Sequence, residues 1–331
     1  MNRFDYYFDM ASKIRSPFVV SKIWNYFKYK TLKRCSVVRR YVPPIASIYL
    51  INRCNLQCNY CGFVKDGTFR QPKQEMTLET IKRAFSHKLL KNCLVADLLG
   101  GEPLLCRDIV PIVNFLSQKG YFTNMPTNGL LLGKKIGDLK NAGIARINVS
   151  IYPENFETLK NSLPQINKVY RVHTSCVLTK TMLENDSQYI FDLINLSVNS
   201  GCKSLRFHIY IPMSKHQSSD DVVTMDFAVY NEFKAKAMEK HKNFIFWPEE
   251  KRREEKRCPY LWQNTNILPD GSLRLCCASM DVIKGVNLFE NSLDEIYNSK
   301  QLVGMRENFL DNSVPPLEMC KGCYKLGETG W

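Results

Sequence analysis

The sequence lacks several features that would place the protein in a common functional class. It has no run of eighteen or more apolar residues and no secretory-type apolar stretch near its start. It also lacks the G-x4-G-K-[ST] phosphate loop, a G-x-G-x-x-G turn after the first expected strand, and the H-E-x-x-H zinc motif. We therefore expect a cytoplasmic protein and find no local support for NTPase, nicotinamide or zinc-protease activity.

Cysteine, in contrast, is abundant. The 331 residues are 44% apolar, enough for a substantial core, and they include thirteen cysteines. A reducing cytosol disfavours structural disulfides, so clustered thiols are more typical of metal sites or reactive groups. Seven cysteines fall into spaced groups, and most of the other six are expected to be small buried residues: Cys35, Cys93, Cys106, Cys176, Cys202 and Cys277.

Positive charge is concentrated near the start of the chain. Residues 1–44 hold ten Lys or Arg against two Asp, a net charge of +8 out of +14 for the whole chain. Aromatic residues, among them Trp24 and Phe27, interleave with these cations. The segment could lie on an anionic membrane surface or hold an acidic partner, or it could be a solvated basic helix that covers one end of the main domain. Nucleic acid is an unlikely partner.

Strand-like and helix-like runs alternate through the middle of the chain. Six strands separated by helices read as repeated βα units, which predicts an α/β fold with a partial (β/α)6 TIM-like barrel. The expected strands lie near 47–52, 94–99, 121–126, 145–152, 170–178 and 204–211. The expected helices lie from Thr77 onward and near 107–119, 133–142, 154–167, 184–200 and 226–241.

After the charged stretch 249–256 the pattern changes. A hairpin is expected around Asp270-Gly271, then a helix near 291–309, and then a loop at Pro315-Pro316. These features predict three parts: a basic segment at 1–44, the barrel at 45–248 and a small C-terminal domain at 249–331.

The segment INRCNLQCNYCGF spaces Cys54, Cys58 and Cys61 as C-x3-C-x2-C, directly after the first strand. That position is the C-terminal mouth of the sheet, where barrel enzymes keep their chemistry. Three thiolates on one loop can hold three corners of a cubane cluster and leave the fourth iron open. A zinc site is the alternative, but the loop supplies neither the fourth thiolate of a structural zinc site nor the His or carboxylate ligands of a catalytic one.

This motif, with an aromatic residue before its last cysteine, resembles the signature of the radical S-adenosylmethionine (SAM) superfamily. The resemblance implies a [4Fe-4S] cluster whose open iron binds the methionyl group of SAM, and a 5′-deoxyadenosyl radical that abstracts a substrate hydrogen atom. It also implies SAM contacts by Gly100, Gly101 and Glu102 of a Gly-Gly-Glu-Pro turn at the methionyl amine, Tyr60 near the adenine, and Asn128 and Ser150 near the ribose and methionyl parts.

A second set of cysteines follows the expected barrel: Cys258, Cys276 at the end of a G-x4-C motif, and Cys320-x2-Cys323. The set resembles the SPASM and Twitch extensions of radical SAM proteins, which implies one auxiliary [4Fe-4S] cluster. Spacing alone does not separate such a cluster from an all-cysteine zinc site.

Cys277 stands next to Cys276 and is a candidate catalytic residue. Adjacent cysteines seldom both ligate one cluster, and a spare thiol can donate a hydrogen atom. The Cys276-Cys277 pair resembles the doubled cysteine of certain radical SAM peptide epimerases. Any of the unassigned thiols could be the hydrogen-atom donor instead.

Two hypotheses follow. The first is a radical SAM enzyme that uses a reductant such as flavodoxin or ferredoxin and acts on a peptide or a small polar, amino sugar-like substrate, with epimerisation, oxidation and carbon-bond formation all open. Arg206, His208 and Tyr210 share one strand face that could meet this substrate. The second is a non-catalytic iron-sulfur or zinc module for electron transfer or nucleic-acid binding.

Overall fold

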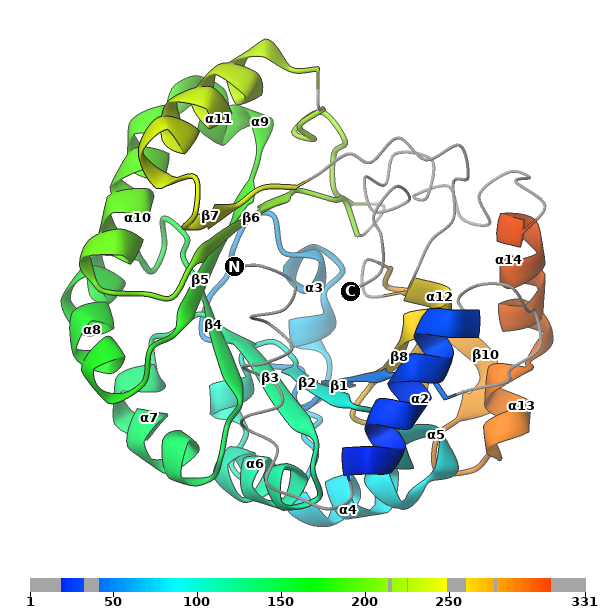
Figure 1. Ribbon diagram of the computed structural model, residues 1–331. Coiled ribbons are helices and arrows are strands. Elements are labelled where there is room, and N and C mark those ends of the chain that lie inside the picture. The colour runs from blue at the N-terminus through cyan, green and yellow to red at the C-terminus, as the bar shows by residue number, and fades with distance from the viewer. Residues whose placement is uncertain are drawn as a thin grey trace.

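The computed structural model describes residues 19–32, 42–213, 216–224, 226–248, 260–276 and 279–310 (Figure 1). Its centre is a mostly parallel sheet in which each strand pairs with the next along the chain. The strands are β1 (Ile45–Tyr49), β2 (Val95–Leu99), β3 (Phe122–Thr127), β4 (Arg146–Ser150), β5 (His173–Leu178), β6 (Leu205–Ile209) and β7 (Ile245–Phe246). The predicted α/β fold is confirmed, and β7 adds a short seventh parallel strand.

Helices cover the outer face of the curled sheet (Figure 1). They are α4 (Leu78–Ser86), α5 (Lys88–Lys91), α6 (Ile109–Gln118), α7 (Leu132–Asn141), α8 (Phe156–Val169), α9 (Lys180–Asn185), α10 (Ser187–Asn199) and α11 (Ala228–His241). The helix expected from Thr77 onward is α4, and Thr77 is its N-cap, because its side chain accepts a hydrogen bond from the Thr80 amide. The helix predicted at 184–200 is instead two helices, with a break at Asp186, whose backbone leaves the helical region.

The C-terminal region extends the same sheet. Strand β8 (Asn264–Ile267) pairs in parallel with β1, and β9 (Ser272–Arg274) and β10 (Val282–Asn287) follow in antiparallel order. The predicted hairpin at Asp270-Gly271 thus joins β8 to β9. The helix predicted at 291–309 is two helices, α13 (Leu293–Tyr297) and α14 (Lys300–Leu310). A capping box at Ser292 and Glu295 starts α13, and the backbone leaves the helical region at its C-cap, Asn298.

Four further helical segments are short: α12 (Tyr260–Gln263) before β8, α3 (Gly62–Lys65) and the 3₁₀ turn η1 (Thr68–Arg70) after β1, and the 3₁₀ turn η2 (Pro103–Leu105) after β2. The edge strands β7 and β10 do not pair with each other, so the barrel is open. Helix α2 (Val19–Leu32) precedes the sheet. None of the described helices is long and apolar enough to cross a membrane.

One row of polar side chains crosses six neighbouring strands in register. It consists of Arg274, Asn266, Ser47, Asp97, Asn124 and Arg146. Within the row, Asn124 Nδ2 donates to Asp97 Oδ1 at 2.9 Å. Burial raises the pKa of Asp97 to about 6, although the hydrogen bond from Asn124 and the charge of Arg146 lower it. The ionised carboxylate therefore costs folding free energy.

Replacing Asp97 with Asn should raise stability near neutral pH. The folded pKa lies above the unfolded value of 3.8, so the cost is absent below about pH 4 and fully present above about pH 6. We expect a gain of about 1–2 kcal/mol at pH 7.5, or roughly 2–6 °C in melting temperature. Thermal melts of cluster-loaded wild type and variant at pH 7.5 and pH 5 measure this gain. If the variant exceeded the wild type in melting temperature by the same amount at both pH values, ionisation of Asp97 would not be the cause.

Candidate active site

The cysteine loop after β1 and the glycine turn after β2 lie directly on each other. The Gly101 amide donates to Ile51 O at 2.9 Å, and the Glu102 amide donates to Arg53 O at 2.8 Å. A Cβ on Gly101 would stand 2.1 Å from Arg53 O, and one on Gly100 would stand 2.7 Å from Ile51 O. Gly100 also has a φ of +149°, which side chains disfavour. The two glycines therefore permit the contact that positions Cys54.

Glu102 ties the glycine turn to the end of β3. Its Oε1 accepts hydrogen bonds from Thr127 Oγ1 at 2.7 Å and from the Leu104 amide at 3.0 Å, and its Oε2 accepts from the Asn128 amide at 2.8 Å. Burial raises the pKa of this carboxyl, whereas these donors lower it. A carboxylate has about four acceptor sites, so Oε2 can still accept a bond from a ligand amine.

Asn128 connects the third loop to the first. Its Nδ2 donates to Asn55 Oδ1 at 2.8 Å and lies 3.9 Å from Cys54 Sγ. Asn155 then joins this loop to β4, because its Nδ2 donates to Asn128 O at 2.7 Å and to Ser150 O at 2.8 Å. Asn155 was not among the predicted site residues. An isolated Asn near a helix start carries no signal for a hydrogen bond to a loop 27 residues earlier.

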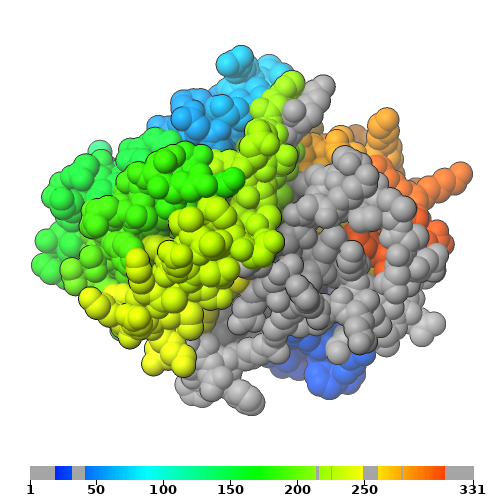
Figure 2. Space-filling model, turned by 90° about the horizontal axis from the view of Figure 1, so that it is seen from above, coloured from blue at the N-terminus to red at the C-terminus, as the bar shows by residue number. Residues whose placement is uncertain are grey.

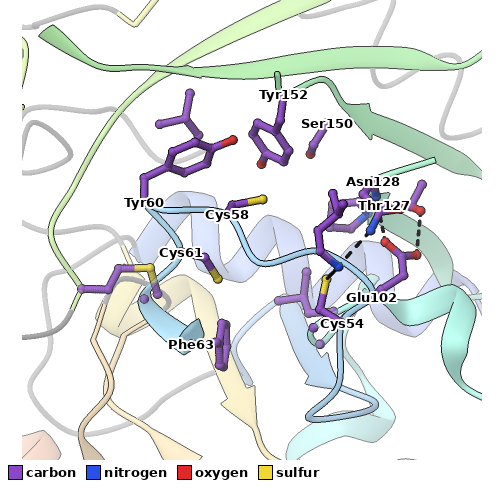
Figure 3. A pocket seen from close by; sticks show the side chains of 18 of the residues that line it. Cys54, Cys58, Tyr60, Cys61, Phe63, Glu102, Thr127, Asn128, Ser150 and Tyr152 are labelled. Carbon is purple, nitrogen blue, oxygen red and sulfur yellow. Dashed lines mark hydrogen bonds between the residues drawn. The ribbon is translucent and has the colours of Figure 1, made fainter. Parts of the chain in front are cut away.

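Tyr60 is placed by contacts on both sides. Its ring centroid lies 5.1 Å from that of Tyr152, and its carbonyl accepts a bond of 2.8 Å from Gln217 Nε2. Tyr152 follows Ser150 at the end of β4. Neither Tyr152 nor Gln217 was among the predicted site residues. Figure 3 shows the two tyrosine rings together at one end of the pocket and the Cys54, Asn128 and Glu102 group at the other.

These residues surround one cavity of about 400 Å³ at the C-terminal ends of the strands. All three loop cysteines line it, as do the predicted SAM-binding residues Tyr60, Gly100, Gly101, Glu102, Asn128 and Ser150. His208 and Tyr210 line it from β6 and the residues beyond, as their predicted strand face suggests. Arg206 of that face lies instead over the Phe246 ring, at 5.2 Å. Among the described lining residues there is no Lys or Arg.

The three thiols suit a cluster better than a single ion. Within the described parts of the chain, no three Cys, His, Asp or Glu side chains gather closely enough to hold one metal ion. A cubane takes each thiolate on a different iron, so it accepts a wider spacing than zinc does. Burial raises the pKa of all three thiols, for Cys58 to about 12, and cluster binding would replace these protons.

The second cysteine set is described only at Cys276, which follows β9 and is half-buried. The other predicted ligands, Cys258, Cys320 and Cys323, lie outside the described residues, as does Cys277. Their assignments stay predictions. Gly271 of the same motif has a φ of +87°, and a Cβ there would stand 2.5 Å from Asn287 Oδ1. Glycine is thus required at this hairpin turn.

Comparison with known families agrees with this geometry. Residues 48–225, more than half of the chain, match the family model of the radical SAM superfamily. The chain belongs to this superfamily. Residues 258–324 match the SPASM iron-sulfur cluster-binding domain. Membership in both implies the predicted cofactors: a [4Fe-4S] cluster with SAM, and an auxiliary cluster. It also favours the enzymatic hypothesis over a non-catalytic module.

Sequence relatives include enzymes named GTP 3′,8-cyclase. That of Aquifex aeolicus is 29% identical over 243 residues, which cover 67% of this chain and 72% of the relative. That of Rhodopirellula baltica is 38% identical over 108 residues, only 31% of this chain and 30% of the relative. This radical SAM protein thus spans less than a third of the length of the Rhodopirellula baltica relative, but nearly three quarters of the Aquifex aeolicus one.

Two solved structures share the fold. Streptococcus suis SuiB bound to its precursor peptide SuiA superposes with a TM-score of 0.63 at 17% identity, over 80% of this chain and 66% of SuiB. The structure of anSMEcpe with bound AdoMet and the Cp18Cys peptide gives a TM-score of 0.60 at 16% identity, over 86% of this chain and 88% of that protein. These similarities establish the architecture of this radical SAM protein.

Proposed function

We propose that this enzyme uses radical SAM chemistry to abstract a hydrogen atom from a peptide or a small polar substrate. The observation that supports the proposal is the single cavity that the three loop cysteines and the predicted SAM-binding residues share with His208 and Tyr210. When bound, the cluster and SAM would supply the 5′-deoxyadenosyl radical. The cavity walls would orient the substrate and exclude water.

Each group of residues has its own part in this proposal. Cys54, Cys58 and Cys61 would hold the cluster. The glycine turn with Glu102 would bind the methionyl amine, Tyr60 would lie near the adenine, and Asn128 and Ser150 would lie near the ribose and methionyl parts. Cys258, Cys276, Cys320 and Cys323 would hold the auxiliary cluster. A flavodoxin- or ferredoxin-like protein would supply the electron.

GTP cyclisation is the second candidate, because the sequence relatives carry that name. A nucleoside triphosphate is normally bound by cationic side chains or by helix N-termini. The described lining of the cavity has neither Lys nor Arg, and its acidic residue, Glu102, accepts hydrogen bonds from Thr127 and the Asn128 amide. Adding GTP and the proposed substrate classes to the same activity assay separates the two candidates.

Release of 5′-deoxyadenosine from SAM tests the enzyme class. The anaerobically reconstituted, reduced protein should form it slowly without substrate and faster with the correct substrate. Peptide mixtures, amino sugars and GTP are compared as added substrates. Acceleration by GTP alone would replace our proposed substrate class, whereas no cleavage by protein with both clusters fully loaded would contradict the proposed enzyme.

The proposed role of Cys277 leads to a separate prediction. If this thiol returns a hydrogen atom to the substrate radical, Cys277→Ala should keep SAM cleavage within about twofold but lose product formation by at least about 100-fold. In D2O, the wild-type product should carry deuterium at the reacting carbon. Cys202→Ala, at a buried cysteine bonded to Asn167, is the control. Full product turnover by Cys277→Ala would rule out the donor role.

A further inference from the structure

Helix α2 presents an apolar face to solvent. Val20 is 70% exposed, Ile23 46%, Trp24 58% and Phe27 55%, and their spacing puts them on one side of the helix. The Trp24 and Phe27 rings stack at 5.9 Å. Among the described residues, six large hydrophobic side chains are exposed, and four of them belong to this stripe. Such a concentration is typical of a binding surface.

The opposite face of α2 is fixed by specific polar contacts. Lys22 Nζ donates to Lys91 O at 2.7 Å and lies 3.7 Å from the centre of the Tyr121 ring. Asn25 Nδ2 donates a hydrogen bond to Val42 O at 2.7 Å, and Asn25 Oδ1 accepts one from the Val42 amide at 3.0 Å. The Tyr29 hydroxyl donates to Gln263 Oε1 of α12 at 3.2 Å. The buried face of α2 thus includes the polar side chains of Lys22 and Asn25, while four large apolar side chains on its other face stay exposed.

The stripe lies at the end of the barrel away from the active site. Val19 and Tyr26 of α2 pack against Ile45, Phe122 and Ala145 at the N-terminal ends of strands, whereas the cavity opens at the C-terminal ends. In Figure 1, α2 lies in front of the strands near β1 and β8. In Figure 2 it forms part of the lower edge of the molecule.

The charged side chains of α2 have one sign. The helix has no acidic residue, Lys28 is exposed and Lys30 is partly exposed, and Lys28 Nζ lies 5.9 Å from the Trp24 ring centroid. Exposed aromatic residues flanked by Lys and Arg are the pattern of helices that lie in the interface of an anionic bilayer.

We propose that α2 docks this protein on an anionic lipid surface. A stable protein interface needs about 800 Å² on each partner, more than four side chains on one convex helix offer. A bilayer accepts a convex apolar ridge and pairs its headgroups with the adjacent cations. Because α2 and the cavity lie at opposite ends of the strands, a docked molecule would keep its cavity open toward the aqueous side.

Vesicle sedimentation of the full, cluster-loaded chain tests the proposal. Binding is expected with vesicles that contain about one-third phosphatidylglycerol, but not with phosphatidylcholine alone, and it should weaken as salt rises. The double change Trp24→Ser and Phe27→Ser should weaken binding at least about tenfold. It should leave 5′-deoxyadenosine release unchanged.

The matched control replaces two described, exposed valines outside α2, Val169→Ser and Val282→Ser, and should bind like the wild type. Equal binding by the α2 variant and the wild type would overturn the role of the stripe, as would the absence of binding to anionic vesicles. A wild-type dimer that the α2 variant dissociates, without any vesicle binding, would instead assign the stripe to a second copy and overturn the lipid proposal.

Discussion

Gly101→Ala is expected to abolish most SAM cleavage, although the change adds a single methyl group. The new Cβ would stand 2.1 Å from Arg53 O, 2.4 Å from Arg53 C and 2.9 Å from Cys54 N. All three are backbone atoms, so no side chain can turn aside. The glycine turn and the cysteine loop must separate. This breaks the hydrogen bonds that the Gly101 and Glu102 amides donate to Ile51 O and Arg53 O.

Separation of the loops would disturb both the cluster and the ligand beside it. A displacement of about 1 Å at a reacting group can cost on the order of 100-fold in rate, and we expect at least that loss of 5′-deoxyadenosine release. Stability should fall by about 2–4 kcal/mol. Both are measured on anaerobically loaded protein, by product release and by thermal melting.

Gly133→Ala and Gly137→Ala are the matched controls. Both glycines lie in α7, and no atom lies within 4 Å of a Cβ built on either. Alanine favours the helix by about 1 kcal/mol relative to glycine, so these variants should melt at the same or a higher temperature and keep activity. Activity of Gly101→Ala close to that of the controls would show that the loops tolerate separation.

The glycine turn also illustrates what sequence could and could not predict. Its position after a strand and its resemblance to a known motif pointed to the site, and the structure places it there. The physical reason for the two glycines was not visible, because it depends on a backbone 48 residues earlier, at Arg53. In the same way, the bonds from Glu102 to Thr127 and Asn128 span 25 and 26 residues.

Local patterns predicted the elements better than their pairing. Strand-like and helix-like runs placed β1 to β6 and the start of α4 closely. In contrast, nothing local shows that β8 pairs with β1, more than 200 residues away. The polar row through Ser47 and Asp97 belongs to the same class of feature, since its members meet only through strand register.

Cys58→Ala should abolish SAM cleavage completely. Cys58 is 7% exposed and lines the cavity with Cys54 and Cys61, so its loss removes one of three thiolates that no described neighbour can replace. If both clusters are present, about eight irons per chain should fall to about four. Product release should drop by at least about 1000-fold, because SAM cleavage requires the electron from this cluster.

Cys93→Ala separates this effect from the loss of a buried cysteine in general. Cys93 is fully buried, and its thiol donates to Pro43 O at the opposite end of the strands. Its removal should cost about 1 kcal/mol of stability and leave iron content and SAM cleavage intact. Iron analysis, electron paramagnetic resonance and product release are compared for the two variants. If Cys58→Ala kept its full iron content and its cleavage, the cluster would not depend on the C-x3-C-x2-C loop.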